Sequence, residues 1–271
     1  MSHPMSLLAL PLLALLMAAP LPALAADSRP PPDLPACPSD QDAPAPVGLL
    51  RRVEYTLEGS SSVGTMTMVI KTPAWSRTLQ MKVWSKGRDY ALVRILKGGP
   101  RETGMMTLKR GKQLWNYLPQ AGRVMKLPSG MLGDSWMGSD FTNDDLVRGT
   151  SIVRDFDAKL SAALTHERRK AWMLVLVPRP RAVVVWGKVE MVVDRATCVP
   201  LLERFYDEDG KLARTMSLGD IRKIGWRDFP ARMAVRPQDA RRETVVTYEE
   251  IRFDADVPDD TFSLHRLQRG R

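Results

Sequence analysis

Residues 184–212 read VVWGKVEMVVDRATCVPLLERFYDEDGKL, and this stretch decides the fold class. Its apolar runs at Val189–Val193 and Leu201–Asp207 are short, rich in β-branched and aromatic residues, and separated by turn-forming residues at 194–197. A second turn follows at residues 208–210, where Asp-Gly is a strong signal for a tight hairpin. The stretch therefore predicts consecutive antiparallel strands.

Strand patterns continue on both sides of this stretch. Several segments have apolar residues at every second position, as expected for strands that face a core on one side, whereas Ala171–Val177 is apolar throughout, as expected for a central strand covered on both faces. The predicted strands are Thr65–Lys71, Leu79–Val83, Tyr90–Leu96, Met105–Lys109, Gln113–Leu118, Arg123–Leu127, Ala171–Val177, Val183–Trp186, Val189–Val193, Leu201–Asp207, Lys211–Leu218 and Thr244–Arg252. Helices are expected at Asn143–Arg148 and Ala158–Leu164, with a short turn at Asp259–Phe262. We therefore expect a mainly β (α+β) domain over residues 48–267, built on one large antiparallel sheet.

The two ends of the chain lie outside this domain. Residues 1–25 contain an apolar segment and end in Ala-Leu-Ala, which predicts a secretory signal peptide with cleavage near Ala25–Ala26. This segment is too short and too interrupted by proline for a transmembrane helix. Residues 26–47 are rich in Pro, Ala and Asp, which predicts an extended linker, and residues 268–271 form a short basic tail.

The chain has two cysteines, Cys37 and Cys198. In an oxidising compartment they can form one disulfide, and closing so long a loop would stabilise the fold by about 4–5 kcal/mol. Two unrelated thiols are the alternative. Acylation of Cys37 is a further, weaker alternative, because charged and proline residues separate it from the apolar segment. No metal site is expected, since His166 and His265 have no ligand spacing.

The net charge of +9 belongs entirely to the chain after residue 25. A basic exported protein is attracted to anionic lipid head groups by about 1 kcal/mol for each well-placed Lys or Arg. We therefore expect transient contact with a membrane surface, although a well-solvated surface explains the charge equally well. No nucleic-acid recognition motif is present, so no nucleic-acid partner is expected.

Residues 131–148, here called the flap, read MLGDSWMGSDFTNDDLVR and mix turn-forming residues with large apolar side chains. The apolar side chains that are expected to be buried are Met131, Leu132, Trp136, Met137 and Phe141. A helix is expected to follow, because Thr142 can cap it and Asp145 stands at its third position. The flap either closes an apolar groove as a movable cover or packs permanently on a core.

No catalytic pattern is complete. The segment around Ser135 lacks the second glycine of a nucleophile elbow, and no spacing joins Ser, His and Asp into a triad, so no enzyme is expected. Methionine is the positive signal, because thioether side chains suit variable apolar ligands, although they also fill gaps in irregular cores. The candidate residues for an apolar groove and its cover are Met66, Met68, Ile70, Leu79, Met81, Val83, Trp115, Trp136, Met137 and Phe141.

The order of these elements resembles that of a known family. The segments GSDFTNDDLVR (138–148), residues 184–212, FPAR (229–232) and VPDDTF (257–262) look like the LolA-like outer-membrane lipoprotein-sorting family. The resemblance covers residues 49–267. It implies an unclosed, strongly curved antiparallel β-barrel with a few short helices over its concave face.

The resemblance also implies a function. Proteins of this family carry the acyl chains of lipoproteins across the periplasm, which implies a periplasmic carrier that takes these chains or another lipid, needs no cofactor and is not an enzyme. The implied partners are an inner-membrane transporter and an outer-membrane acceptor. Two alternatives remain: a lipid-sensing regulatory protein of the same fold, and a lipid hydrolase that uses Ser135.

Overall fold

The computed structural model describes residues 30, 31, 33, 34, 36–38, 43–147, 152–182, 184–238 and 241–269. The predicted signal peptide therefore lies outside the described residues, as do Arg148 and Val183. The main element is one 13-stranded sheet in the order β6-β5-β4-β3-β2-β1-β13-β12-β11-β10-β9-β8-β7. Its strands are β1 (Ser61–Lys71), β2 (Ser76–Lys86), β3 (Tyr90–Lys97), β4 (Met106–Arg110), β5 (Gln113–Leu118), β6 (Arg123–Lys126), β7 (Phe156–His166), β8 (Arg169–Pro178), β9 (Lys188–Asp194), β10 (Pro200–Tyr206), β11 (Leu212–Ile224), β12 (Arg227–Pro237) and β13 (Glu243–Phe253).

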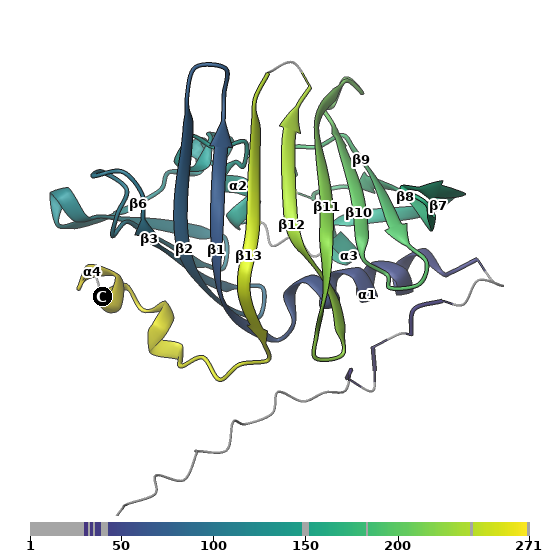
Figure 1. Cartoon of the computed structure of the whole chain (residues 1–271), viewed down its shortest axis with the longest axis horizontal. Helices are drawn as coiled ribbons and strands as arrows, with labels where there is room; N and C mark the ends of the chain where they lie inside the picture. Colours follow the sequence, from purple (N-terminus) through teal and green to yellow (C-terminus); the bar gives the residue numbers. More distant parts are fainter. Residues whose placement is uncertain are drawn as a thin grey trace, which may run out of the picture.

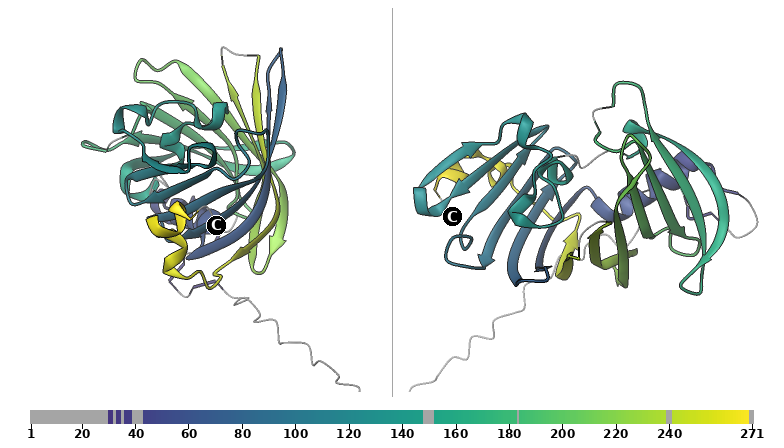
Figure 2. Two further views of the ribbon diagram at one scale, coloured as in Figure 1. Left: turned by 90° about the vertical axis from the view of Figure 1, so that its left-hand side faces the viewer. Right: turned by 90° about the horizontal axis from the view of Figure 1, so that it is seen from above.

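The sheet is an antiparallel meander in two halves that join at its centre. There the first strand pairs with the last, with Met66 opposite Tyr248 and Met68 opposite Val246 (Figure 1). The terminal strands β6 and β7 do not pair with each other in the sheet, so the barrel is not closed. Figure 2 shows how strongly the sheet curves. The predicted fold class, an unclosed curved β-barrel, is confirmed.

Alternation along the strands decides which face is buried. Met68 and Ile70 on β1, and Leu79 and Met81 on β2, are fully buried on the concave face, because side chains of a strand alternate between the two faces of a sheet. In the other half, Leu174 on β8 is also fully buried on the concave face.

Short helices and turns lie over and around the sheet. The α-helices are α1 (Pro46–Glu58), α2 (Asn143–Val147), α3 (Ile152–Asp155) and α4 (Leu264–Gln268), and the 3-10 turns are η1 (Pro119–Ala121), η2 (Ser129–Met131), η3 (Trp136–Gly138) and η4 (Asp259–Phe262). In Figure 1, α2 and α3 lie behind the sheet, on its concave side. None of the helices in the described ranges is long and apolar enough to cross a membrane.

The helix α1 is a difference from the sequence prediction, which started the β domain at Gly48. Pro46 begins α1 at a position where a missing N–H costs nothing, and Gly59 ends it with a positive φ of 66°, which glycine adopts readily. Between them, Leu49, Leu50 and Val53 pack on the inner face of β8 and β9. This spacing is helical, and it is the signal that the strand interpretation overlooked.

Three further elements differ from the prediction. The helix expected at Ala158–Leu164 is instead part of β7, because Ala158 and Leu160 point to the same core while the backbone pairs with β8. Residues 184–186 are irregular rather than a strand. The long strand β12 was not predicted, and it contains Pro230.

The two cysteines form the expected disulfide. Cys37 and Cys198 are bonded, with their Cα atoms 5.8 Å apart, so that residues 36–38 are attached to the turn between β9 and β10. At the other end of the chain, Phe262 and Leu267 pack on the convex face of β3 and β4. Leu267 is 1% exposed, and α4 continues to Gln268, beyond the predicted end of the domain.

Candidate functional site

The flap packs on the concave face of the first half of the sheet. Trp136 is 4% exposed, and its indole N–H donates a hydrogen bond to Thr107 Oγ1 on β4 at 3.3 Å. Phe141 and Leu146 contact the same cluster of buried side chains. That cluster comprises Met66, Met68, Ile70, Leu79, Met81, Val93, Ile95, Trp136 and Val246.

A reciprocal cap begins α2 inside the flap. The Asp145 backbone N–H donates to Thr142 Oγ1 (3.2 Å), and the Thr142 backbone N–H donates to the Asp145 carboxylate (2.8 Å). This is the capping box that the sequence predicted, and the helix follows it as expected. The cap places the Asp145 side chain at the start of α2, where it also reaches β11.

Two carboxylates attach the flap to the second half of the sheet. Asp145 forms a two-pronged ion pair with Arg214 on β11, with both N–O distances 2.7 Å. Asp140 pairs with Arg242 and accepts a hydrogen bond from the Thr244 hydroxyl at 2.7 Å. Two-pronged pairs between arginine and a carboxylate are among the stronger charged contacts in proteins, so the flap is held at defined points.

A pocket of about 440 Å³ lies between the flap, α1 and the inner face of β8–β13. Trp136, Phe141 and Leu146 of the flap form one wall, and Val53 and Leu57 of α1 form another. The sheet supplies a third wall, which is mainly apolar: Leu176, Val189, Met191, Phe205, Met216, Leu218, Met233 and Val246. Most of the lining therefore favours hydrocarbon over water.

The predicted groove residues occupy three different places. Met66, Trp136 and Phe141 line the pocket. Met68, Ile70, Leu79, Met81, Val83 and Met137 belong to the cluster beneath the flap. Trp115 lies on the convex face. It stands opposite Leu108 of β4 and points to the same face as Leu108. The residue before Leu108, Thr107, points to the other, concave face, where it contacts Trp136. On the convex face, Trp115 packs with the C-terminal segment.

One polar end of the pocket is formed by the β10–β11 hairpin. Glu203 and Phe205 on β10 point inward beside Arg214 on β11, since Phe205 stands directly opposite Arg214. The Arg214 guanidinium lies over the rings of Phe205 (4.5 Å) and Trp186 (4.6 Å). Burial raises the pKa of Glu203 from 4.5 to about 7; the charge of Arg214 opposes this rise and that of Asp145 adds to it.

A second polar group lies at the end of α1. Glu54 and Glu58 line the pocket there, and both pair with Arg88 from the β2–β3 turn, the Glu58 contact measuring 3.6 Å. Burial, and then the neighbouring charge of Glu54, raise the pKa of Glu58 to about 7, against the effect of Arg88. Burial also lowers the pKa of Lys109, which faces this group from β4.

Comparison by sequence places the chain in a family. A family model with the description "Uncharacterized protein" matches residues 87–269, which is well over half of the chain. The chain belongs to this family. A search of curated proteins finds no match.

Solved structures show the same fold. A DUF1329 family protein from Desulfovibrio piger is 21% identical with a TM-score of 0.75, covering 82% of this chain and 97% of that one. A putative outer membrane lipoprotein-sorting protein domain from Vibrio parahaemolyticus is 21% identical with a TM-score of 0.74, covering 83% and 98%. A LolA superfamily protein from Nitrosomonas europaea is 20% identical with a TM-score of 0.69, covering 82% and 98%. The LolA-like fold implied by the sequence resemblance is confirmed.

Within this LolA-like fold, Ser135 forms hydrogen bonds inside the flap. Its hydroxyl donates to the Ser139 carbonyl oxygen at 2.5 Å, inside the flap, and its backbone pairs with Thr142. Neither Ser135 nor a histidine is among the residues that line the pocket in the described part of the chain.

The charged residues of the pocket were not predicted from the sequence. Arg214 and Asp145 are 69 residues apart, and only the position of the flap brings them together. A signal for Glu203 and Arg214 did exist. The Asp-Gly turn fixes the register of the β10–β11 hairpin, which places both residues on the inner face.

Proposed function

We propose that this protein is a periplasmic carrier that binds the acyl chains of lipoproteins, or of another lipid, in the pocket between the flap and α1. The observation that carries the proposal is the pocket itself: about 440 Å³, mostly apolar, with the flap as one wall. Its volume is in the range of about 300–1,000 Å³ that is usual for ligand sites. The fold shared with a lipoprotein-sorting protein domain supports this function.

Burial of hydrocarbon supplies the binding energy. A sixteen-carbon chain gains on the order of 12 kcal/mol when it leaves water, at about 0.8 kcal/mol per methylene. Part of that gain is offset by ordering of the chain and of the protein. A carrier needs no catalytic group, only a dry pocket and a wall that can move. In this proposal the flap is that wall: Trp136 anchors it in the apolar cluster, and its ion pairs with Arg214 and Arg242 can break and reform.

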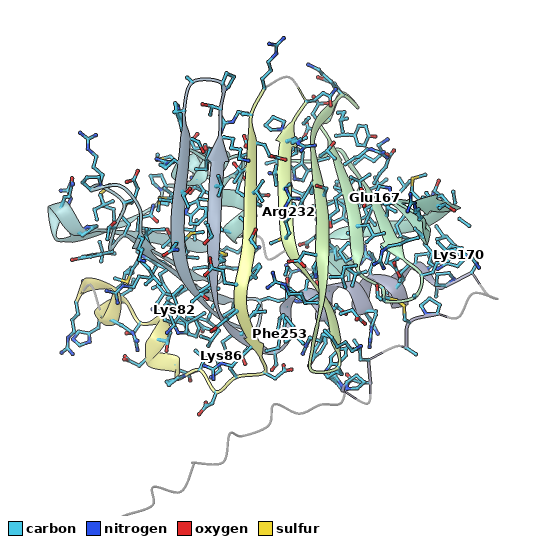
Figure 3. The ribbon with its side chains drawn as sticks, viewed as in Figure 1. Lys82, Lys86, Glu167, Lys170, Arg232 and Phe253 are labelled. Carbon is cyan, nitrogen blue, oxygen red and sulfur yellow. A yellow bond between two sulfur atoms is a disulfide. The ribbon has the colours of Figure 1, made fainter. Side chains whose placement is uncertain are left out.

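Exchange of the cargo requires contact with membranes and with membrane proteins. Lys82 on β2 and Arg232 on β12 lie on the convex face, where Figure 3 labels them, and the chain carries a net charge of +9. Basic side chains on an outer face suit transient contact with anionic lipid head groups. In this proposal an inner-membrane transporter loads the carrier and an outer-membrane acceptor unloads it.

The proposal is tested by lipid binding with a matched pair of variants. Val184 lines the pocket and is partly buried, whereas its neighbour Val185 is 43% exposed and is not part of the lining. Val184→Trp fills pocket volume, so we expect affinity for a fluorescent neutral acyl ester to fall by about tenfold or more, a loss of roughly 1.4 kcal/mol or more. Val185→Trp serves as the control and should bind normally.

The same preparations are extracted with organic solvent and analysed by mass spectrometry. We expect lipid to co-purify with the wild-type protein and to be depleted in Val184→Trp. A wild-type protein that carries no lipid and also fails to bind the acyl ester would refute the carrier function.

A further inference from the structure

The turn between β1 and β2 exposes a tryptophan at its tip. Of the seven tryptophans, all of which the structure describes, only Trp75 is exposed, at 47%. Pro73 and Ala74, which precede it, are exposed as well. The Trp75 backbone N–H donates to Thr72 Oγ1 (3.1 Å), and the Thr72 backbone N–H donates to the Trp75 carbonyl oxygen (2.9 Å). The turn is therefore an uncharged, apolar tip that is held by its own hydrogen bonds.

Basic residues surround this tip. Lys71 of β1 stands opposite Glu243 of β13, and Val235 of β12 stands opposite Thr244, so the end of β12 and the start of β13 lie beside the β1–β2 turn. Figure 1 shows β1, β2, β12 and β13 reaching the same end of the sheet. In the sequence, residues 71–77 and 236–243 contain five lysines or arginines and two acidic residues, a net charge of +3. The exposed tryptophan therefore lies at a positively charged end.

Part of this positive charge has no acidic partner. Three of the five basic side chains are in ion pairs: Arg77 with Glu102, Arg236 with Glu243, and Arg242 with Asp140. Lys71 and Arg241 are exposed and form no ion pair within the described ranges. Further along the same end of the sheet, the β10–β11 turn is acidic at residues 207–209. The spare positive charge is therefore confined to the two hairpins beside Trp75.

The same two hairpins hold the flap. Arg77 donates a hydrogen bond to the Met137 carbonyl oxygen, and Arg242 donates one to the Gly138 carbonyl oxygen at 3.1 Å. The flap is one wall of the pocket, through side chains such as Trp136. A surface that binds the hairpin tips is therefore placed beside the wall that moves in the proposed carrier.

We propose that the tips of the β1–β2 and β12–β13 hairpins dock the protein on an anionic lipid bilayer, with the Trp75 ring in the head-group region and with Lys71 and Arg241 against the lipid phosphates. This inference rests on the proposed function for the purpose of the contact, because it identifies the end of the carrier that meets the membrane. The contact itself does not depend on the cargo.

An anionic bilayer matches both features of the tips. Tryptophan is enriched where membranes meet water, because its ring is apolar while its indole N–H still finds hydrogen-bond partners. Basic side chains are attracted by the negative surface potential of anionic lipids, over a distance of about 8 Å at physiological salt. A free anion would engage the two charges but not the ring, and an uncharged apolar surface would engage the ring but not the charges.

Docking is measured by flotation of the protein with lipid vesicles. The protein is purified after export, because residues 1–25 would themselves bind lipid if they were retained. Vesicles of phosphatidylethanolamine with about one-quarter phosphatidylglycerol are compared with vesicles of phosphatidylcholine. We expect binding to the anionic vesicles to be tighter by about tenfold or more, and to weaken as salt is added. Equal binding to both kinds of vesicle, or none to the anionic ones, would overturn the inference.

The aromatic contact is tested at Trp75. Trp75→Ser should weaken binding to the anionic vesicles by about fivefold or more, whereas Trp75→Phe, which keeps an aromatic ring, should retain most of the binding. Met125→Ser is the control, because Met125 is 45% exposed on β6, which four strands separate from β1. All three variants should bind the fluorescent acyl ester normally, since neither residue lines the pocket.

The contribution of charge is tested by the same substitution at opposite ends of the sheet. Lys71→Glu reverses a charge beside Trp75, and Lys112→Glu reverses one in the β4–β5 turn, where Lys112 is also exposed. We expect Lys71→Glu to weaken binding to the anionic vesicles by about fivefold or more, and Lys112→Glu by less than about twofold.

The outcomes separate this inference from the carrier function. If Trp75→Ser and Lys71→Glu bind the vesicles as the wild type does, the membrane contact lies elsewhere and the inference is overturned. If the wild type binds a membrane protein but no vesicles, the tips serve a protein partner, and the inference is again overturned. If the tip variants lose vesicle binding while the wild type neither carries lipid nor binds the acyl ester, the docking site is supported and only the carrier function fails.

Discussion

The two halves of the concave face have similar apolar surfaces but different covers. Beneath β1–β3 the flap follows the sheet closely, and Trp136 fills the space so completely that Met68 and Met81 are 0% exposed. Beneath β9–β12 the space between the flap and α1 remains as a pocket of about 440 Å³. One half is therefore a packed core, and the other keeps the cavity that we propose as the binding site.

The difference shows how a curved sheet can keep a cavity. The flap is made of short turns and one five-residue helix, so it can adapt its backbone to the curve of the sheet. The helix α1 is one continuous helix of 13 residues, and its buried side chains share a cluster with side chains of β7, β8 and β9. A helix of this length cannot follow a strongly curved sheet at every point, so it leaves a gap that close packing would otherwise have removed.

The largest expected effect comes from removing a tryptophan from each half. Trp136→Ala deletes a side chain from the packed half and should lower the free energy of unfolding by about 3–5 kcal/mol. Trp186→Ala deletes one that borders the existing pocket, so its loss should be smaller, about 1–2 kcal/mol. Chemical denaturation of both variants measures the difference. Equal losses would contradict the assignment of one half as core and the other as pocket.

A smaller effect is expected at the contact between the halves. Asp145→Asn keeps the shape of the side chain but leaves the Arg214 charge buried without a partner, which should destabilise the protein by about 2–3 kcal/mol. Backbone amides of the flap should also exchange faster with deuterium. Asp134→Asn is the control, because Asp134 is exposed on the same flap. Identical flap exchange in both variants would show that the ion pair does not hold the flap.

The smallest effect is a dependence of stability on pH. Burial raises the pKa of Glu203 and of Glu58 from 4.5 to about 7, so the folded chain binds more protons than the unfolded chain between these values. The contribution of these two groups to the free energy of unfolding is therefore full below about pH 4.5 and is lost as the pH rises through 7. Glu203→Gln should be more stable than the wild type by about 1–2 kcal/mol at pH 8.

The pH experiment has an internal check. At about pH 3 the two proteins should have nearly equal stability, because that pH lies well below both pKa values and Glu203 is then protonated in both the folded and the unfolded state. For Glu190, burial acts to raise the pKa, but hydrogen bonds from Lys188 and Tyr206 lower it overall. Glu190→Gln should therefore be less stable than the wild type at pH 8. Two variants that shift in the same direction would refute the assignment of Glu203 as a desolvated acid.

Most of the sheet was predictable from the sequence because alternation is a local signal. The strands at Thr65–Lys71 and around the Asp-Gly turn can be recognised from their own residues, since consecutive side chains of a strand point to opposite faces. The segment Ala158–Leu164 was misread because alanine and leucine favour helices, while pairing with β8 overrides that local preference. The capping box at Thr142 was predictable for the same reason as the strands: it depends on residues close in sequence.

The pocket was not predictable in the same way. Which of the inward side chains are covered depends on where the flap lies, and that position is set by contacts such as Asp145 with Arg214, which join distant parts of the chain. Trp115 illustrates the second difficulty. Without the register of β4 and β5, an aromatic residue on a strand can be assigned to either face, and it lies on the convex one.

The disulfide has a mechanical consequence. Because Cys37 and Cys198 are bonded, a force that pulls on the two ends of the chain passes directly from one sulfur to the other. The backbone of the intervening segment, which spans 161 positions and contains α1, the flap and β1–β9, cannot be extended by that force while the bridge is intact. Stretching would then peel the strands that follow Cys198, and the packed half beneath the flap would keep its own hairpins until the bond is reduced.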